Sequence, residues 1–151
     1  MQDQFDILHK NRALITKIVS GLTLEQLNTI PQGFKNNIAW NLAHLVATQQ
    51  LLCYFNSGNK MLVDDTFIET YKKGTAPIKL MSQEELDQVL QFFKSLPEQL
   101  EKDYSNGLLN NYNVYTTSVE VTLDSVEKAI GFNNFHEGIH LGCILALRKL
   151  V

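Results

Sequence analysis

Two histidines four residues apart, His136 and His140, have the spacing best suited to chemistry in this sequence. They lie in an apolar run, from about residue 123 to 150, whose periodicity predicts a helix. In a helix, residues four apart lie about 40° apart around the axis and roughly 6 Å apart along it, so the two imidazoles share one face. This arrangement suits two ligands of one metal ion. We expect both to point toward the core, beside a stripe formed by Ala129, Phe132, Ile139, Cys143, Leu147 and Leu150.

A third histidine, His44, lies within a second helical pattern, from residue 36 to 55. That pattern has one apolar seam with the spacing of a helix bundle, formed by Trp40, His44, Ala47, Leu51 and Tyr54. Helix bundles build metal sites from side chains on facing helices, so we predict a divalent-metal site at His44, His136 and His140. Three neutral imidazoles leave a coordination position open for water or substrate, as in reactive zinc sites.

Other interpretations of these residues stay open. Core histidines are often structural and hydrogen-bonded, so the three could serve packing alone. Residues His136 to His140 also match H-E-x-x-H, the zinc-protease pattern, but Cys143 and Ala146 occupy the places of the glycine and histidine of its longer form. Cys143 is either a small core residue or a thiolate facing the metal. Candidate hydrogen-bond partners of the imidazoles are Glu137, Asn41, Asn133 and Asn134.

Four long helical patterns position these side chains. They cover residues 5–22, 36–55, 82 to about 104, and about 123–150. Ser82 begins the third with a capping box to Glu85, and Thr122 or Asp124 caps the fourth. We expect Pro97 to kink or break the third helix. His9 falls off the apolar stripe of the first helix, so we expect it to be exposed to solvent.

The connections between these helices are predicted from turn residues. Thr23 to Gln26 forms a second capping box, which indicates a short helix to about residue 29. Residues 58–81 form a long connection, with a helical turn or two near 65–71, that crosses the bundle or covers a cavity. Residues 114–123 are β-branched and predicted to be extended. The fold class is therefore all-α, a four-helix bundle with a long crossover connection.

Composition narrows the class of protein. The 151 residues are 44% hydrophobic, which fits one domain spanning residues 1–151. The net charge is −3 with no basic cluster, so we expect no nucleic-acid or membrane partner. The first residues are acidic, unlike a signal peptide. Cys53 and Cys143, the only two cysteines, lie in apolar helical patterns, which favours reduced thiols in the cytoplasm, although a disulfide between them stays open.

Three segments resemble the DinB/YfiT-like family of metalloenzymes, and the likeness runs over most of the chain. Residues 36–46, which contain Trp40 and His44, look like the family's second-helix motif. Residues 73–77 resemble its crossover loop, and residues 135–142 its last-helix motif. The resemblance implies a four-helix bundle, with nickel or zinc held by the histidine trio, and a homodimer. It departs at Cys143, where many relatives have a polar residue such as Gln.

Relatives in this family act on small-molecule substrates as transferases or isomerases that use a low-molecular-weight thiol. The resemblance therefore favours an enzyme in which the metal lowers the pKa of a bound thiol or water. Thiol S-transfer is our first hypothesis and metal-dependent hydrolysis the second. The alternative from another class is a non-catalytic dimeric interaction bundle, whose metal or histidines are structural.

Overall fold

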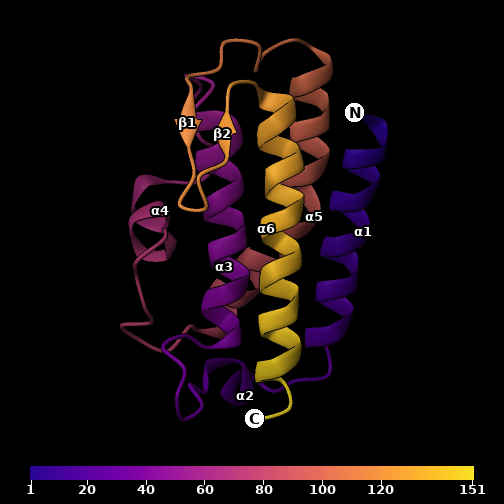
Figure 1. The fold of residues 1–151 in the computed structure, drawn as a ribbon. Coiled ribbons are helices and arrows are strands. Elements are labelled where there is room, and N and C mark those ends of the chain that lie inside the picture. Colours follow the sequence, from indigo (N-terminus) through magenta and orange to yellow (C-terminus); the bar gives the residue numbers. More distant parts are fainter.

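The computed structural model describes residues 1–151 and is all-α apart from one small hairpin. Four long helical segments lie side by side, which confirms the predicted bundle (Figure 1). They are α1 (Gln2–Val19), α3 (Ile38–Gln49) with its π-helical continuation η1 (Gln50–Phe55), α5 (Gln83–Ser105) and α6 (Val126–Leu147). The short elements are α2 (Leu24–Asn28), α4 (Asp65–Tyr71), β1 (Tyr115–Thr116) and β2 (Thr122–Leu123).

The long connection between η1 and α5 returns the chain to the end of the bundle where α3 begins, so α3 and α5 run in parallel (Figure 1). Helix α4 lies on this crossover and packs against α3. Helices α1 and α3 each pack against both α5 and α6. The histidine motifs on α3 and α6 are therefore neighbours in space despite their separation in sequence.

Local hydrogen bonds at the helix starts agree with most of the predicted caps. Both capping boxes form, at Thr23 and at Ser82. The predicted cap of α6 is wrong, because Ser125 holds that position and its hydroxyl accepts from the Lys128 amide at 3.4 Å. Thr122 is paired with Thr116 in the β1–β2 hairpin, and the Asp124 carboxylate binds the Lys128 ammonium instead.

Pro97 lies inside α5 without breaking it, so the alternative of two separate helices is wrong. A proline in a helix interior removes one backbone hydrogen bond and costs roughly 3 kcal/mol. Here Leu96, Pro97 and Leu100 are all buried against the bundle. Their packing offsets the lost bond and keeps the helix continuous.

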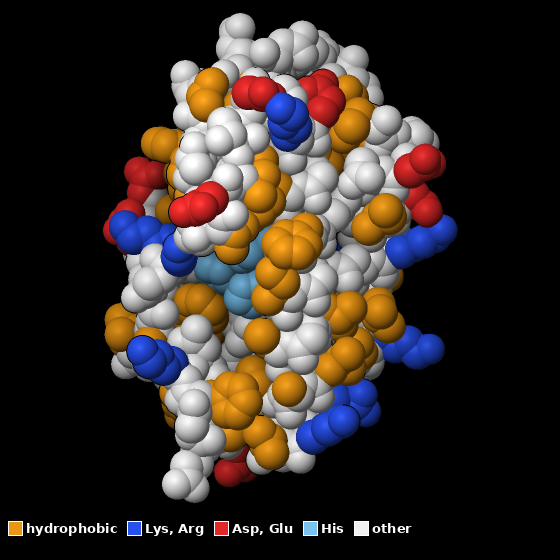
Figure 2. Space-filling view, in the orientation of Figure 1, with side chains coloured by type: hydrophobic (Ala, Val, Ile, Leu, Met, Phe, Trp, Pro, Cys, Tyr) orange, Lys and Arg blue, Asp and Glu red, His pale blue; other side chains and the backbone are white.

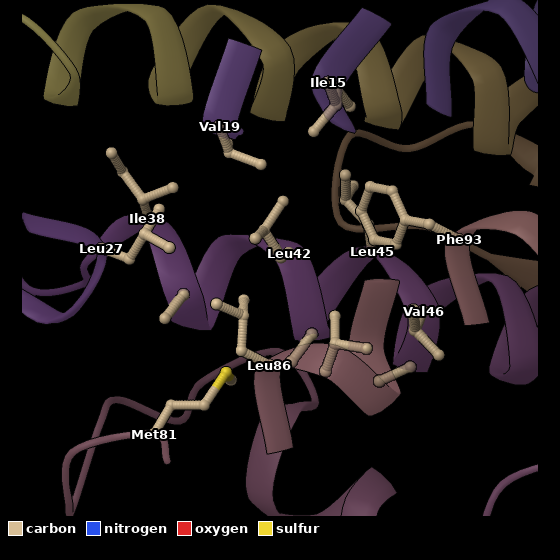
Figure 3. Close-up of a cluster of buried hydrophobic side chains, with 14 of the residues drawn as sticks. Ile15, Val19, Leu27, Ile38, Leu42, Leu45, Val46, Met81, Leu86 and Phe93 are labelled. Atoms are coloured by element: carbon tan, nitrogen blue, oxygen red, sulfur yellow. The ribbon is translucent and has the colours of Figure 1, made fainter. Parts of the chain in front are cut away.

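The apolar core has two parts, separated along the bundle axis by a polar layer. The larger part joins α1, α3, α5 and the end of α6, and Figure 3 shows Ile15 of α1 facing Leu42 and Leu45 of α3. The smaller part lies around Leu8, Leu100 and Ile130. Between these levels lie five buried or half-buried polar side chains, Asn11, Arg12, Gln49, Asn133 and Glu137. No helix has both the length and the apolar character needed to cross a bilayer.

Candidate metal centre

The three predicted ligands come together between α3 and α6. One side-chain nitrogen from each of His44, His136 and His140 lies within 4.8 Å of the other two. The ring centroids of His136 and His140 are 4.5 Å apart, and the His44 ring lies 5.2 Å from that of His136 and 4.8 Å from that of His140. The histidines form the floor of a hollow on the face of the molecule drawn in Figure 2, with hydrophobic side chains around it.

The crossover segment fixes the orientation of His44. Its Nδ1 lies 2.7 Å from the backbone carbonyl of Tyr71, the last residue of α4. Carbonyls in the last turn of a helix have no partner within the helix, so this one accepts the Nδ1–H and leaves a lone pair on Nε2. Trp40 stacks on the imidazole at 4.5 Å, and its indole N–H donates to the Thr75 hydroxyl at 3.1 Å.

The orientation of His140 is fixed by Asn41, as predicted for a partner of the imidazoles. The Asn41 side-chain oxygen lies 2.7 Å from His140 Nδ1. Because the amide nitrogen of Asn41 donates to the Asn37 carbonyl at 2.7 Å, the oxygen must be the atom that faces the histidine. His140 therefore donates through Nδ1–H, and its Nε2 has a free lone pair.

His136 differs from the other two because its Nδ1 is buried and has no hydrogen-bond partner. Burial, together with the neighbouring His140, His44 and Arg12, lowers the pKa of His136 to about 3. Burial and His44 lower the pKa of His140 to about 4. The pKa of His44 is also lowered by burial. At neutral pH all three imidazoles are therefore uncharged, the form that binds a metal.

The donor set fits a divalent metal ion. Three neutral imidazoles suit zinc, nickel, copper or ferrous iron. In a tetrahedral zinc site the ligand nitrogens lie about 3.4 Å apart, so nitrogens within 4.8 Å need to close by at most about 1.4 Å. The Nε2 of His140 keeps its lone pair, that of His44 contacts only the Thr48 hydroxyl at 3.4 Å, and the buried Nδ1 of His136 has no partner. Each imidazole therefore has a nitrogen that an ion between the rings could bind.

Comparison with known protein families agrees with this site. The sequence profile that describes the DinB superfamily matches residues 7–144, a span that includes all three histidines. This chain belongs to the DinB superfamily. The predicted family resemblance is thereby confirmed, and the family and the histidine cluster together fit a metal-binding protein. A search of curated proteins gave no match.

In this DinB-superfamily chain Glu137 is part of the core and contacts none of the imidazoles, so its predicted role as their hydrogen-bond partner is wrong. Its carboxylate is fully buried and binds the Arg12 guanidinium, with a shortest contact of 2.7 Å. Asn11 and Asn133 each donate to it at 3.0 Å. A carboxylate held this way has no access to the hollow, so the H-E-x-x-H match does not supply a general base.

Sequence reasoning missed Arg12, although a signal was present. Arg12 lies four residues after Leu8 and three before Ile15, so it continues the buried stripe of α1. Its guanidinium also stacks 4.2 Å from the centre of the Phe93 ring. A charged residue on a buried stripe requires a partner of opposite charge, and Glu137 is that partner.

The stripe predicted for α6 is wrong in part. The buried residues of this helix follow Ile130, Asn133, Glu137 and Ile144, so the two histidines lie at its edge beside α3. Most residues predicted to share their stripe are exposed or half-buried instead, namely Phe132, Ile139, Cys143 and Leu150, whereas Ala129 and Leu147 are buried.

Neither cysteine belongs to the site. Cys143 is exposed and lies outside the histidine cluster, which overturns both expectations for it, a core residue or a thiolate facing the metal. Cys53 is buried, which raises the pKa of its thiol to about 12 and makes it unreactive. Both are free thiols, as predicted.

The remaining candidates contact other groups. His9 is half-buried, not exposed as expected, and lies 3.1 Å from the Glu101 carboxylate. Asn134 donates to Gln4 of α1, and Asn133 to Glu137, so neither orients a histidine. Two groups that do contact the site have no sequence signature as such, the backbone carbonyl of Tyr71 and the Thr48 hydroxyl, 3.4 Å from His44 Nε2.

Proposed function

We propose that this protein is a divalent-metal-dependent enzyme whose ion, zinc or nickel, is held by His44, His136 and His140. The observation that carries the proposal is the convergence of three uncharged imidazoles, two of them oriented by Tyr71 and Asn41. Structural histidines in a core would be expected to satisfy each other or nearby polar groups, yet the buried Nδ1 of His136 has no partner.

A divalent ion in this position lowers the pKa of a thiol or a water that occupies its open coordination position. The three histidines hold the ion, while Tyr71 and Asn41 keep two of the ligand nitrogens pointed at it. Hydrophobic side chains around the hollow supply apolar surroundings for a small-molecule substrate (Figure 2).

Among reactions, we favour transfer of a low-molecular-weight thiol to a small electrophile. The sulfur forms a bond to the electrophilic carbon, the leaving group departs with its electron pair, and the thiol proton goes to solvent. The family supports the thiol, and so does the site, because Glu137 is engaged by Arg12 and is not available as a general base. A thiol, with a pKa of about 8.5, needs far less activation than water. Metal-dependent hydrolysis is therefore second.

Metal analysis of untagged protein tests the proposal. Mass spectrometry should find about one metal ion per chain in the wild type and none in His44→Ala. His9→Ala is the matched control, because His9 contacts Glu101 and lies outside the cluster. Loss of metal only in the cluster variant would justify a screen of thiol substrates. A wild type that takes up neither zinc nor nickel would refute the enzyme proposal.

One observation favours the second candidate, a dimeric interaction bundle, and we propose a homodimer in either case. The exposed positions in the middle and end of α6 are all uncharged, namely Phe135, Gly138, Ile139, Gly142, Cys143, Leu145 and Ala146. In Figure 2 the charged side chains lie mainly toward the edges of this face. An uncharged centre with a polar rim is typical of interfaces. Because the face has no charge to select an acidic or basic partner, a second copy is the occupant that we propose.

Sedimentation equilibrium tests the homodimer. Ile139→Lys should dissociate it, because the substitution places a charge at the centre of the face. Ile78→Lys is the control, since Ile78 is more exposed but lies on the crossover. A monomeric wild type would refute the dimer. If the dimer forms and no metal binds, the interaction bundle is the better function.

The two free thiols further support our proposal of a cytoplasmic location.

A further inference from the structure

Three buried asparagines form a continuous chain of hydrogen bonds that ends at His140. Asn28 binds the backbone of Met81 twice, accepting from its amide at 2.8 Å and donating to its carbonyl at 3.0 Å. Asn37 donates to the Asn28 carbonyl at 2.8 Å, and Asn41 donates to the Asn37 carbonyl at 2.7 Å. Asn41 then accepts from His140 at 2.7 Å. The chain therefore links the end of the crossover to a proposed metal ligand.

The direction of every amide in this chain is determined by its partners. A backbone carbonyl only accepts, so the nitrogen of Asn37 must face Asn28, and the nitrogen of Asn41 must face Asn37. The oxygen of Asn37 accepts from the Trp40 amide at 2.8 Å and caps α3. Asn41 is thus left with only its oxygen for His140. A flip of Asn41 would set its oxygen against the backbone carbonyl of Asn37, two acceptors facing each other.

We propose that Asn41 is a positioning residue that holds His140 in the Nδ1–H tautomer and thereby keeps its Nε2 lone pair toward the metal. The proposal rests on the proposed function for the identity of the metal site. The tautomer of His140 is a property of the metal-free protein and can be measured without an ion. In neutral imidazole either nitrogen carries the proton, and the hydrogen bond at one nitrogen decides which. Without Asn41, a share of His140 would present an N–H where the metal needs a lone pair.

Two substitutions of Asn41 separate positioning from a structural role. Asn41→Asp keeps an acceptor for His140 but places a buried carboxylate against the Asn37 carbonyl, so this variant should be the less stable one. Asn41→Leu removes the acceptor without adding a charge. We expect zinc affinity, measured by competition with a chromophoric chelator, to be retained in Asn41→Asp and to fall by about 10- to 100-fold in Asn41→Leu.

The order of affinities is therefore expected to oppose the order of stabilities, which urea unfolding measures. Zinc affinity that simply follows stability would overturn the proposal. Asn134→Leu is the matched control, because its amide lies on α6 two residues before His136 but donates to Gln4. Its zinc affinity should equal that of the wild type.

A second measurement needs no metal and no aspartate variant. Long-range proton–nitrogen correlation spectra of chelator-treated protein identify the protonated nitrogen of each histidine. We expect His140 to be Nδ1–H in the wild type and to lose this single tautomer in Asn41→Leu, while His44 keeps its own through Tyr71. An Nε2–H form of His140 in the wild type would overturn the proposal. If zinc fails to bind while the tautomers are as expected, the metal enzyme is refuted and the positioning of His140 is not.

Discussion

Neutralising Glu137 should destabilise this protein far more than neutralising any other acidic residue. Arg12 is 2% exposed and Glu137 0%, and their ion pair lies in the polar layer between the two parts of the core. Glu137→Gln has nearly the same shape but leaves the guanidinium of Arg12 buried without a counter-charge. Removing one partner of a buried pair costs about 3–5 kcal/mol. For a chain of this length, that lowers Tm by roughly 6–20 °C.

The assay is urea unfolding of chelator-treated protein, followed by circular dichroism at neutral pH. Glu101→Gln is the matched control, because its carboxylate pairs with His9 at the surface. An exposed pair contributes at most about 1 kcal/mol. We also expect the double variant Arg12→Met, Glu137→Leu to recover most of the loss, because apolar residues of similar size replace a buried ion pair at little or no cost.

Two results would refute this reasoning. A loss below about 1 kcal/mol in Glu137→Gln would mean that the pair is effectively solvated, contrary to its burial. A double variant as unstable as the single one would mean that shape and hydrogen bonds, not charge, explain the loss.

Three further outcomes are expected. Thr48→Val should leave zinc affinity unchanged or slightly tighter in chelator competition, because the Thr48 hydroxyl contacts His44 Nε2 and competes with the metal. A clearly weaker zinc affinity would contradict this expectation. Acid should destabilise the metal-free protein between about pH 6.5 and 4. Burial holds the pKa of His136 near 3 and that of His140 near 4 in the folded state, so the unfolded chain binds more protons in this pH window. Urea unfolding at pH 7 and pH 5 measures this loss of stability, and His136→Gln should make the loss smaller. Chelation should leave the far-ultraviolet circular dichroism spectrum unchanged, because the core packs without the ion. Zinc at 100 times its Kd should add about 2.7 kcal/mol to the free energy of unfolding. A protein that unfolds on chelation would indicate a structural metal.

Much of the secondary structure of this protein can be predicted from the local sequence pattern. The four long helices, two capping boxes and the turn at α4 depend on residues within a few positions of each other, so the pattern alone predicts them. The local pattern also predicts that the three histidines group together. The spacing of His136 and His140 places both on one face of any helix, and His44 interrupts an otherwise apolar seam.

The buried face of helix α6 could not be predicted from the sequence pattern. This helix is apolar on nearly every side, so its sequence does not indicate which face is buried. The pattern predicts that Ile139 and Cys143 face the core, yet both are exposed, and Glu137 faces inward. The rotation of α6 is set by a partner 125 positions earlier in the chain, Arg12.

The sequence by itself determined which residues hold the proposed metal and which helices carry them. Only the tertiary structure decided how those residues are oriented. The Tyr71 carbonyl that holds His44 is a backbone group with no side-chain signature, and it reaches the site because the crossover packs α4 against α3. Helix periodicity specifies a face to within one helix, whereas the contact between two faces depends on packing across the whole bundle.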